Sequence, residues 1–212
     1  MPSEKPKAKE GRFKVNLFPL RCFSFQASDS LVNDTLEKAK KLEYRNYNPD
    51  GGVGTSNDIQ SMPEFRELHL WFQECIDTLH ADNGWQVDRM VVNKSWINRS
   101  DAKKGHHHAP HRHPMSYLSG IFYLTEGTPT VFLDPLAQRN MSQFDLTGSE
   151  EIYQSIHPRI GGCFIFPSYL IHSSIENLEE TDRFTVAFNT FPTGNIREGG
   201  WGNPLLKLEV IK

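Results

Sequence analysis

The stretch Gly105–Tyr123, GHHHAPHRHPMSYLSGIFY, holds five of the nine histidines of the chain and leads directly into an apolar, strand-like run. Histidine is the commonest side-chain ligand for metal ions. His111 and His113 are separated by one residue, and alternate residues of an extended strand point to the same side. The two imidazoles could therefore converge on one ion. The alternative is a solvated histidine-rich loop, which is our interpretation of His106–His108.

A third histidine, His172, ends the segment GGCFIFPSYLIH at residues 161–172. A Gly-Gly turn precedes an apolar strand there, Pro-Ser interrupts it, and the histidine follows five residues after Pro167. A core strand followed by a surface histidine would have the same pattern. However, a metal site can form in a β-barrel when one strand end supplies two ligands and a strand that folds back beside it supplies the third. His111 and His113 would be the two ligands, and His172 the third.

Arg183-Phe184-Thr185 follows eleven residues after His172, at the start of another β-type run. Arg183 and Thr185 would face one side of that strand, and would share it with His172 if the two strands paired as a hairpin. A guanidinium can hold a carboxylate through two parallel hydrogen bonds, and a threonine hydroxyl adds a donor. The alternative is a surface arginine in an edge strand.

The rest of the chain has helical patterns first and β-type runs second. Apolar residues at three- and four-residue steps predict helices over 29–45 and 62–81, with Ser28 or Asp29 and Ser61 as N-caps. The second helix carries His69 and His80, which we expect to be structural or surface residues. A loop is expected over 47–56. The expected strands are 15–25, 87–98, 116–124, 130–133, 152–157, 162–166, 171–175, 184–191 and an edge strand at the C-terminus packed on the helices. Many short strands without helices between them predict a sandwich or jelly roll.

The expected organisation is a disordered tail over 1–13, a helical support region over 14–84 and a β core over 85–212, with 14–212 as one integrated domain. The net charge of −3 gives no reason to expect nucleic-acid binding. Cys22, Cys75 and Cys163 form no CxxC pattern and suit a reducing compartment. No signal peptide or membrane-spanning run is visible, so we expect a cytoplasmic protein. The oligomeric state is not predicted, and a homodimer stays open.

Taken together, these motifs resemble the 2-oxoglutarate- and Fe(II)-dependent oxygenases. The shared order is a close histidine pair, a distant histidine, and an arginine about ten residues later with Ser or Thr two positions on. The wording of the sequence is similar to a family of such oxygenases common in marine bacteria and their phages. The similar segments are HxHP with SxLSGIFYL, TPTVFLDP, PRIGGCFIFPSYLIHSS and RFTVAFN, together with SWIN at Ser95–Asn98 and LFP near the N-terminus. The similarity covers residues 85–192 well and the helical part loosely.

The resemblance implies a mainly β protein, a double-stranded β-helix (jelly roll) with the N-terminal helices packed on one sheet. The implied cofactors are Fe(II) and 2-oxoglutarate, with ascorbate as reductant in vitro, and the implied compartment is the cytoplasm of a bacterium or of a phage-infected host. The implied activity is that of a dioxygenase, a hydroxylase that couples 2-oxoglutarate decarboxylation to oxidation of a substrate C–H bond by O2. The implied metal ligands are His111, His113 and His172, the implied cosubstrate residues are Arg183, Thr185, Tyr123 and Asn98, and Ser119 is a further pocket residue.

Position 113 departs from the common pattern of the superfamily, in which His-x-Asp or His-x-Glu supplies a carboxylate ligand. A third neutral ligand leaves the site one unit more positive and shifts its preference towards Zn, Ni or Cu. Either three histidines bind the metal, or water fills that position. A sensor module without turnover therefore stays open, as does a cupin-like dioxygenase, although the latter has no need of Arg183. The substrate is not predicted; 51–56 and 139–149 are candidate lids.

Overall fold

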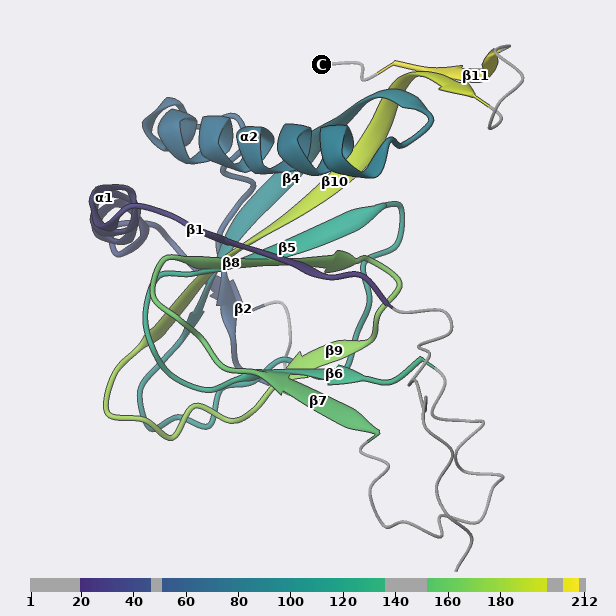
Figure 1. Ribbon diagram of the computed structural model, residues 1–212. Coiled ribbons are helices and arrows are strands. Elements are labelled where there is room, and N and C mark those ends of the chain that lie inside the picture. The colour runs from purple at the N-terminus through teal and green to yellow at the C-terminus, as the bar shows by residue number, and fades with distance from the viewer. Residues whose placement is uncertain (1–19, 47–50, 136–151, 198–203, 210–212) are drawn as a thin grey trace, which may run out of the picture.

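The computed structural model describes residues 20–46, 51–135, 152–197 and 204–209, and within them the protein is mainly β (Figure 1). The helices are α1 (Asp29–Ala39), the single 3-10 turn η1 (Pro63–Phe65) and α2 (Arg66–Asn83). The strands are β1 (Phe23–Gln26), β2 (Arg45–Asn46), β3 (Gly54–Thr55), β4 (Val87–Ser100), β5 (Leu118–Tyr123), β6 (Thr130–Leu133), β7 (Tyr153–Ile156), β8 (Gly162–Pro167), β9 (His172–Ser174), β10 (Arg183–Arg197) and β11 (Pro204–Leu208).

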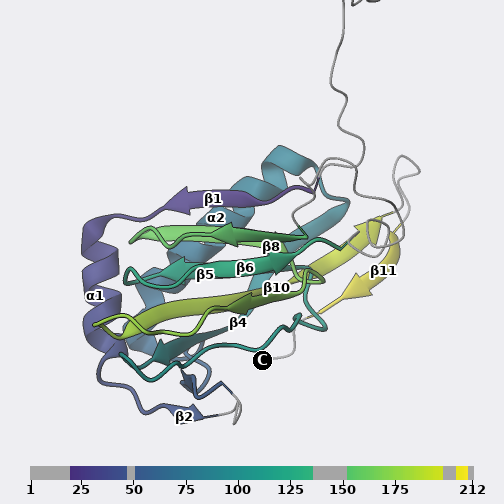
Figure 2. The same ribbon diagram turned by 90° about the horizontal axis from the view of Figure 1, so that it is seen from below.

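The strands form two antiparallel sheets that face one another. The large sheet has the order β1-β8-β5-β10-β4-β3-β2, with β11 added to β10, and the small sheet has the order β7-β6-β9. Figure 1 shows α2 against one face of the large sheet and the small sheet against the other, and Figure 2 shows the strands of the large sheet side by side. This is the expected jelly roll with helices packed on one sheet.

The outer face of the large sheet is closed by the apolar stripe of α2. Leu68, Phe72, Ile76 and Leu79 are buried, and they belong to one core cluster with strand residues such as Phe188. The rings of Phe72 and Phe188 lie 4.4 Å apart. Because this face is filled by core packing, the inner face between the sheets is left for a site.

Successive side chains of β5 point to opposite faces of the large sheet. Phe122 belongs to the helix-side core, whereas Ile121 and Tyr123 belong to a second cluster that lies between the sheets. A glycine is required at position 120, since a Cβ there would lie 2.2 Å from the ring of Phe188. The sequence alone left open which parity of β5 faces inwards, and the packing of α2 decides it.

Several expected boundaries were wrong at the N-terminal end. The first strand is confined to Phe23–Gln26; residues 20–22 are not in a strand, and 15–19 lie outside the described residues. The first helix is capped by Ser28 as expected, through a 3.3 Å bond from the Leu31 N–H, but it ends at Ala39. The Tyr44 hydroxyl donates to the Ala39 carbonyl oxygen at 2.7 Å, so a side chain binds the helix end and the chain turns into β2.

The segment expected as a loop also contains a strand. Gly54–Thr55 pairs with β2 and β4, so the support region contributes strands to the large sheet. The expected cap at Ser61 was wrong, because the helical segment starts one residue later with a 3-10 turn at Pro63 whose N-cap makes no side-chain bond. The C-terminal edge strand is present, but it pairs with β10. The division at residues 84 and 85 stays a prediction.

Candidate metal and cosubstrate site

Three imidazoles meet between the two sheets. His111, His113 and His172 each offer a ring nitrogen, and these nitrogens lie within 4.8 Å of one another. The ring centroids are 4.4 Å apart for His111 and His172, 5.0 Å for His113 and His172, and 5.3 Å for His111 and His113. The three residues singled out in the sequence are therefore brought together in the fold, and the cluster could hold a metal ion.

Main-chain carbonyl groups orient two of the three rings. The Nδ1 atom of His111 lies 2.8 Å from the carbonyl oxygen of Ala109, and Nδ1 of His172 lies 3.0 Å from that of Leu170. A carbonyl oxygen only accepts, so both Nδ1 atoms carry the proton and both Nε2 atoms keep a lone pair. This is the arrangement found in metal-binding histidines, whose second nitrogen donates to an oxygen behind it.

The route by which these residues meet differs from the expectation. His111 forms a single bridge to His172 rather than part of a continuous strand, and His113 lies just beyond it. The hairpin between the strands of His172 and Arg183, under which they would share one side, does not form, because β9 belongs to the small sheet and β10 to the large one. The two side chains instead face one another across the space between the sheets.

Burial keeps the imidazoles of His172 and His113 neutral at physiological pH. Desolvation lowers the pKa of His172 to about 3, with His111 as the next cause. Desolvation likewise lowers the pKa of His113 to about 4, against an opposing hydrogen bond to Asn189. Among the described residues that line the pocket there is no aspartate or glutamate to offset this effect. The neutral ring is the form that binds a metal.

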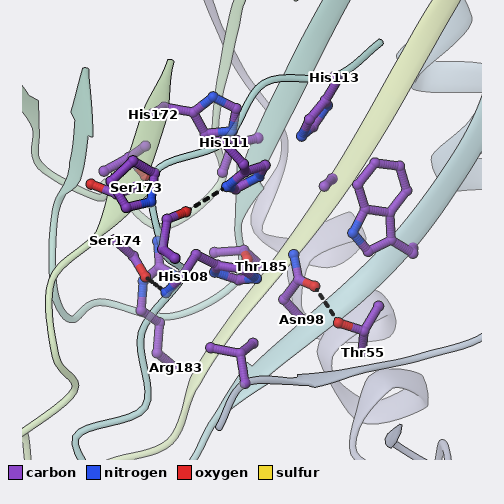
Figure 3. Close-up of a pocket in the computed structure, with 17 residues that line it drawn as sticks. Thr55, Asn98, His108, His111, His113, His172, Ser173, Ser174, Arg183 and Thr185 are labelled. Carbon is purple, nitrogen blue, oxygen red and sulfur yellow. Dashed lines mark hydrogen bonds between the residues drawn. The ribbon is translucent and has the colours of Figure 1, made fainter. Parts of the chain in front are cut away.

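The triad opens into a pocket of about 360 Å3 that also contains Arg183 (Figure 3). Arg183 is 3% exposed, and its Nε donates to the Thr128 carbonyl oxygen at 3.1 Å. Its guanidinium carbon lies 5.8 Å from the centre of the Tyr123 ring. No ion pair joins it to a carboxylate of the described chain. A buried cation without a counter-ion is costly, so this end of the pocket suits an anionic ligand.

Two of the other predicted cosubstrate residues line the pocket with Arg183, and the third lies behind the pocket wall. Thr185 and Asn98 line the pocket and are partners in the register of β10 and β4. The Thr55 hydroxyl donates to Asn98 Oδ1 at 3.1 Å, which leaves the amide N–H groups to face the pocket (Figure 3). Tyr123 lies behind the pocket wall, where its hydroxyl is 2.9 Å from the Thr130 hydroxyl.

His108 lines the same pocket, although the sequence suggested only a loop residue. Its ring lies 5.7 Å from that of His111, and burial, followed by His111 and Arg183, lowers its pKa to about 3. The segment is aligned along β9 by a bond from the His108 N–H to the Ser174 hydroxyl at 2.8 Å. That contact joins residues 66 positions apart, and no local pattern in the sequence indicates it.

The structure also shows what His69 and His80 contact and where one of the candidate lids lies. His69 and His80 are structural, with Nε2 atoms 2.7 Å from the Ser95 hydroxyl and 2.9 Å from the Val87 carbonyl oxygen. Of the two candidate lids, 51–56 contributes Val53 and Thr55 to the pocket wall, and 139–149 lies outside the described residues.

The same fold occurs in solved structures of other proteins. The α-ketoglutarate-dependent epimerase SnoN from nogalamycin biosynthesis is 13% identical, with a TM-score of 0.65 over 90% of both chains. HygX from Streptomyces hygroscopicus, solved with nickel and 2-oxoglutarate, is 14% identical, with a TM-score of 0.56 over 82% of this chain and 84% of that one. A Pseudomonas putida prolyl-4-hydroxylase is 10% identical, with a TM-score of 0.57 over 82% and 94%. No curated protein matches in sequence.

The fold is the jelly roll of these solved structures, and the triad is a cluster that could hold a metal ion. Residues 94–189 match the sequence model of a family described as "Putative 2OG-Fe(II) oxygenase". This part of the chain is thus similar to a 2OG-Fe(II) oxygenase domain, which is a domain of oxidoreductases. The marine bacterial or phage type stays a prediction. No helix in the described ranges combines the length and apolar character needed to cross a bilayer.

Proposed function

We propose that the protein is a hydroxylase that holds Fe(II) by the Nε2 atoms of His111, His113 and His172 and clamps 2-oxoglutarate with Arg183. One observation carries the proposal: the triad shares a pocket with a buried guanidinium that has no carboxylate partner in the described chain. The triad suits the metal end of the cosubstrate, and the guanidinium suits its distal carboxylate.

The donor set fits Fe(II) when the cosubstrate is included. Three imidazoles are acceptable to iron as well as to nickel, copper and zinc. They bring no negative charge, so Fe(II), doubly charged 2-oxoglutarate and Arg183 leave a net charge of +1 in the pocket. A carboxylate at position 113 would make that sum zero. A carboxylate ligand would neutralise part of the positive charge of the metal, and three histidines do not. We therefore expect the protein to bind the dianionic cosubstrate strongly, because that positive charge attracts the cosubstrate.

Each neighbour of Arg183 has a distinct part in this proposal. Thr185 and Asn98 donate hydrogen bonds to the cosubstrate from the inner face of the large sheet. Tyr123 packs against the guanidinium and, through its bond to Thr130, holds that end of the pocket in place. His108, a neutral imidazole between the triad and Arg183, offers a further donor to the bound dianion (Figure 3).

When bound, Fe(II) and 2-oxoglutarate supply the oxidising chemistry, in which O2 is reduced while 2-oxoglutarate is converted to succinate and CO2. The protein orients the reactants and excludes water. Ala187 is in register with Trp96 on one neighbouring strand and Ile121 on the other, which gives an apolar row along the pocket. Epimerisation needs a group that returns a hydrogen atom. Among the described residues, the pocket lining has no tyrosine or cysteine for that role, which favours hydroxylation.

The test is anaerobic calorimetry with Fe(II) and then 2-oxoglutarate, followed by succinate release in the presence of O2 and ascorbate. Binding of both with succinate release supports the proposal. Stoichiometric binding of both without succinate release would favour a sensor, and metal binding without affinity for 2-oxoglutarate would favour the cupin-like alternative. For the hydroxylase assignment, a metabolite screen under labelled O2 should find a product that has gained one labelled oxygen atom.

A further inference from the structure

His113 is held differently from the other two members of the triad. Its Nδ1 atom lies 2.7 Å from the side-chain oxygen of Asn189 and 2.9 Å from the Ser119 hydroxyl. The corresponding atoms of His111 and His172 face main-chain carbonyl groups. The orientation and tautomer of His113 therefore depend on side chains, which makes them open to mutation.

Behind Ser119 lies a chain of hydroxyl groups. Ser119 and Ser168 are 2.8 Å apart, Ser168 donates to Ser116 at 2.8 Å, and Ser116 donates to the carbonyl oxygen of Leu118 at 2.9 Å. Ser119 and Ser168 are 0% and 1% exposed, so water does not compete for these bonds. The chain thus links His113 to a main-chain oxygen through two buried serines, Ser119 and Ser168, and the half-buried Ser116.

Oxygen atoms that only accept determine the direction of these hydrogen bonds. A carbonyl oxygen only accepts, and each hydroxyl has a single proton to donate. Ser116 therefore donates to Leu118, and Ser168 donates to Ser116. The Ser119 hydroxyl lies 2.9 Å from Asn189 Oδ1, to which it donates, and 2.8 Å from the Ser168 hydroxyl. The amide oxygen of Asn189 only accepts and lies 2.7 Å from His113 Nδ1, so Nδ1 must be the donor of that bond.

We propose that Ser116, Ser168, Ser119 and Asn189 are positioning residues that keep His113 as the Nδ1–H tautomer with Nε2 directed at the metal. This network thereby makes a histidine usable at a position where the superfamily commonly has a carboxylate. The inference rests on the proposed function, in which His113 is a ligand.

The register of the large sheet places this network. Asn189 on β10 is paired with Ser119 on β5, and both point to the inner face. Ser168 follows β8 directly, and its carbonyl oxygen accepts the main-chain N–H of His113 at 3.1 Å. The segment that carries His113 is thus held by its main chain and by its ring at the same place. No carboxylate takes part, so the network orients the ring without adding negative charge.

The first experiment reads the tautomer directly. In metal-free protein, long-range proton–nitrogen NMR correlations distinguish a protonated Nδ1 from a protonated Nε2, and a His113→Gln variant assigns the signal. We expect protonated Nδ1. A protonated Nε2 would overturn the inference, because that atom would then have no lone pair for a metal.

The second experiment measures Ni(II) affinity by calorimetry. The double variant Ser119→Ala/Asn189→Leu should lose about 10- to 100-fold, as expected when the outer partner of a ligand histidine is removed. Asn189→Asp keeps an oxygen acceptor and should retain at least the original affinity. Ser95→Ala is the matched control: it removes a buried 2.7 Å serine–histidine bond, to His69, on the opposite side of β4 from the pocket, and should leave the affinity unchanged.

The outcomes separate this inference from the proposed function. Original affinity in the double variant would overturn the inference while leaving the metal site intact. Equal losses in the double variant and in Ser95→Ala would show a general effect of stability and would also overturn it. Absence of metal binding in the unmodified protein would instead contradict the proposed function, and the NMR tautomer would still decide whether the network orients His113.

Discussion

His111 and His172 exchange main-chain hydrogen bonds: the N–H of each donates to the carbonyl oxygen of the other, and both bonds are 2.9 Å long. This reciprocal pair forms an antiparallel bridge between segments 61 positions apart, and their rings lie 4.4 Å from each other. The backbone therefore sets the separation of the two side chains. His113, in contrast, is oriented by side chains.

Replacement of either bridged histidine should abolish metal binding. His111→Ala and His172→Ala each remove one nitrogen of the triad and leave the main-chain bridge able to form, so the fold should persist. Calorimetric titration with Ni(II) or anaerobic Fe(II) measures the loss. His107→Ala is the control, because its Nδ1 bonds to the Gly105 carbonyl oxygen and it does not line the pocket. Equal metal loss in that variant would contradict the ligand assignment.

Substitutions at position 113 should show whether His113 binds the metal. His113→Asp supplies a carboxylate, and we expect Fe(II) affinity to be kept or improved because the hard oxygen donor and negative charge suit the metal. His113→Ala should lose affinity by one to two orders of magnitude, about the effect of removing one strong interaction at a metal site. Affinity that hardly changes in either variant would show that water fills this position.

Arg183 should control cosubstrate affinity without affecting the metal. Arg183→Gln removes the only Lys, Arg, Asp or Glu charge among the described residues that line the pocket. We expect the 2-oxoglutarate dissociation constant to rise by about 100-fold, the size of a lost buried charge-assisted pair. Metal affinity in the absence of 2-oxoglutarate should be unchanged. Arg99→Gln is the matched control, because Arg99 pairs with Asp101 and Asp182 outside the pocket lining. Unchanged 2-oxoglutarate affinity in Arg183→Gln would argue against the clamp.

His108 should contribute to cosubstrate binding although it is not a member of the triad. His108→Ala should weaken 2-oxoglutarate binding by about 10-fold, the effect of one hydrogen bond to a charged group, and should leave metal affinity unchanged. Competition calorimetry of the metal-loaded protein measures both constants. A parallel His107→Ala titration tests whether loss of any histidine from this loop has the same effect. Loss of metal in His108→Ala would instead make His108 a fourth ligand.

The metal-free protein should lose stability on acidification. His172 has a folded pKa of about 3 and an ordinary value of 6.5, so between these values the unfolded state binds more protons than the folded state. The free energy of unfolding should therefore fall as pH drops below 6.5, by about 1.4 kcal/mol per pH unit for this buried group. Urea denaturation at several pH values checks this. His172→Gln should flatten the dependence, and an equally steep dependence in that variant would contradict the assignment.

Much of the fold was readable because its signals are local. The apolar stripe through Leu68 and Phe72 predicted a helix, and the Thr130–Leu133 strand has the expected bounds. Where prediction failed, contacts without a periodic pattern decided. The Tyr44 hydroxyl donates to the carbonyl oxygen of Ala39, five residues earlier, where α1 ends. Gly54–Thr55 is a strand only because it pairs with β2 and β4, the latter far along the chain. A two-residue strand has no periodicity of its own, so its sequence could not show it.

For the site, the sequence by itself singled out the candidate residues: the close pair His111 and His113, the distant His172, and Arg183 beyond it. Only the tertiary structure decided how they meet, with His172 and Arg183 on opposing sheets rather than in one hairpin. It also brought His108 into the pocket and placed Asn189 behind His113. The physical reason is that ligand type is a property of single residues, whereas the relative position of these residues depends on hydrogen bonds between segments that are distant in the chain.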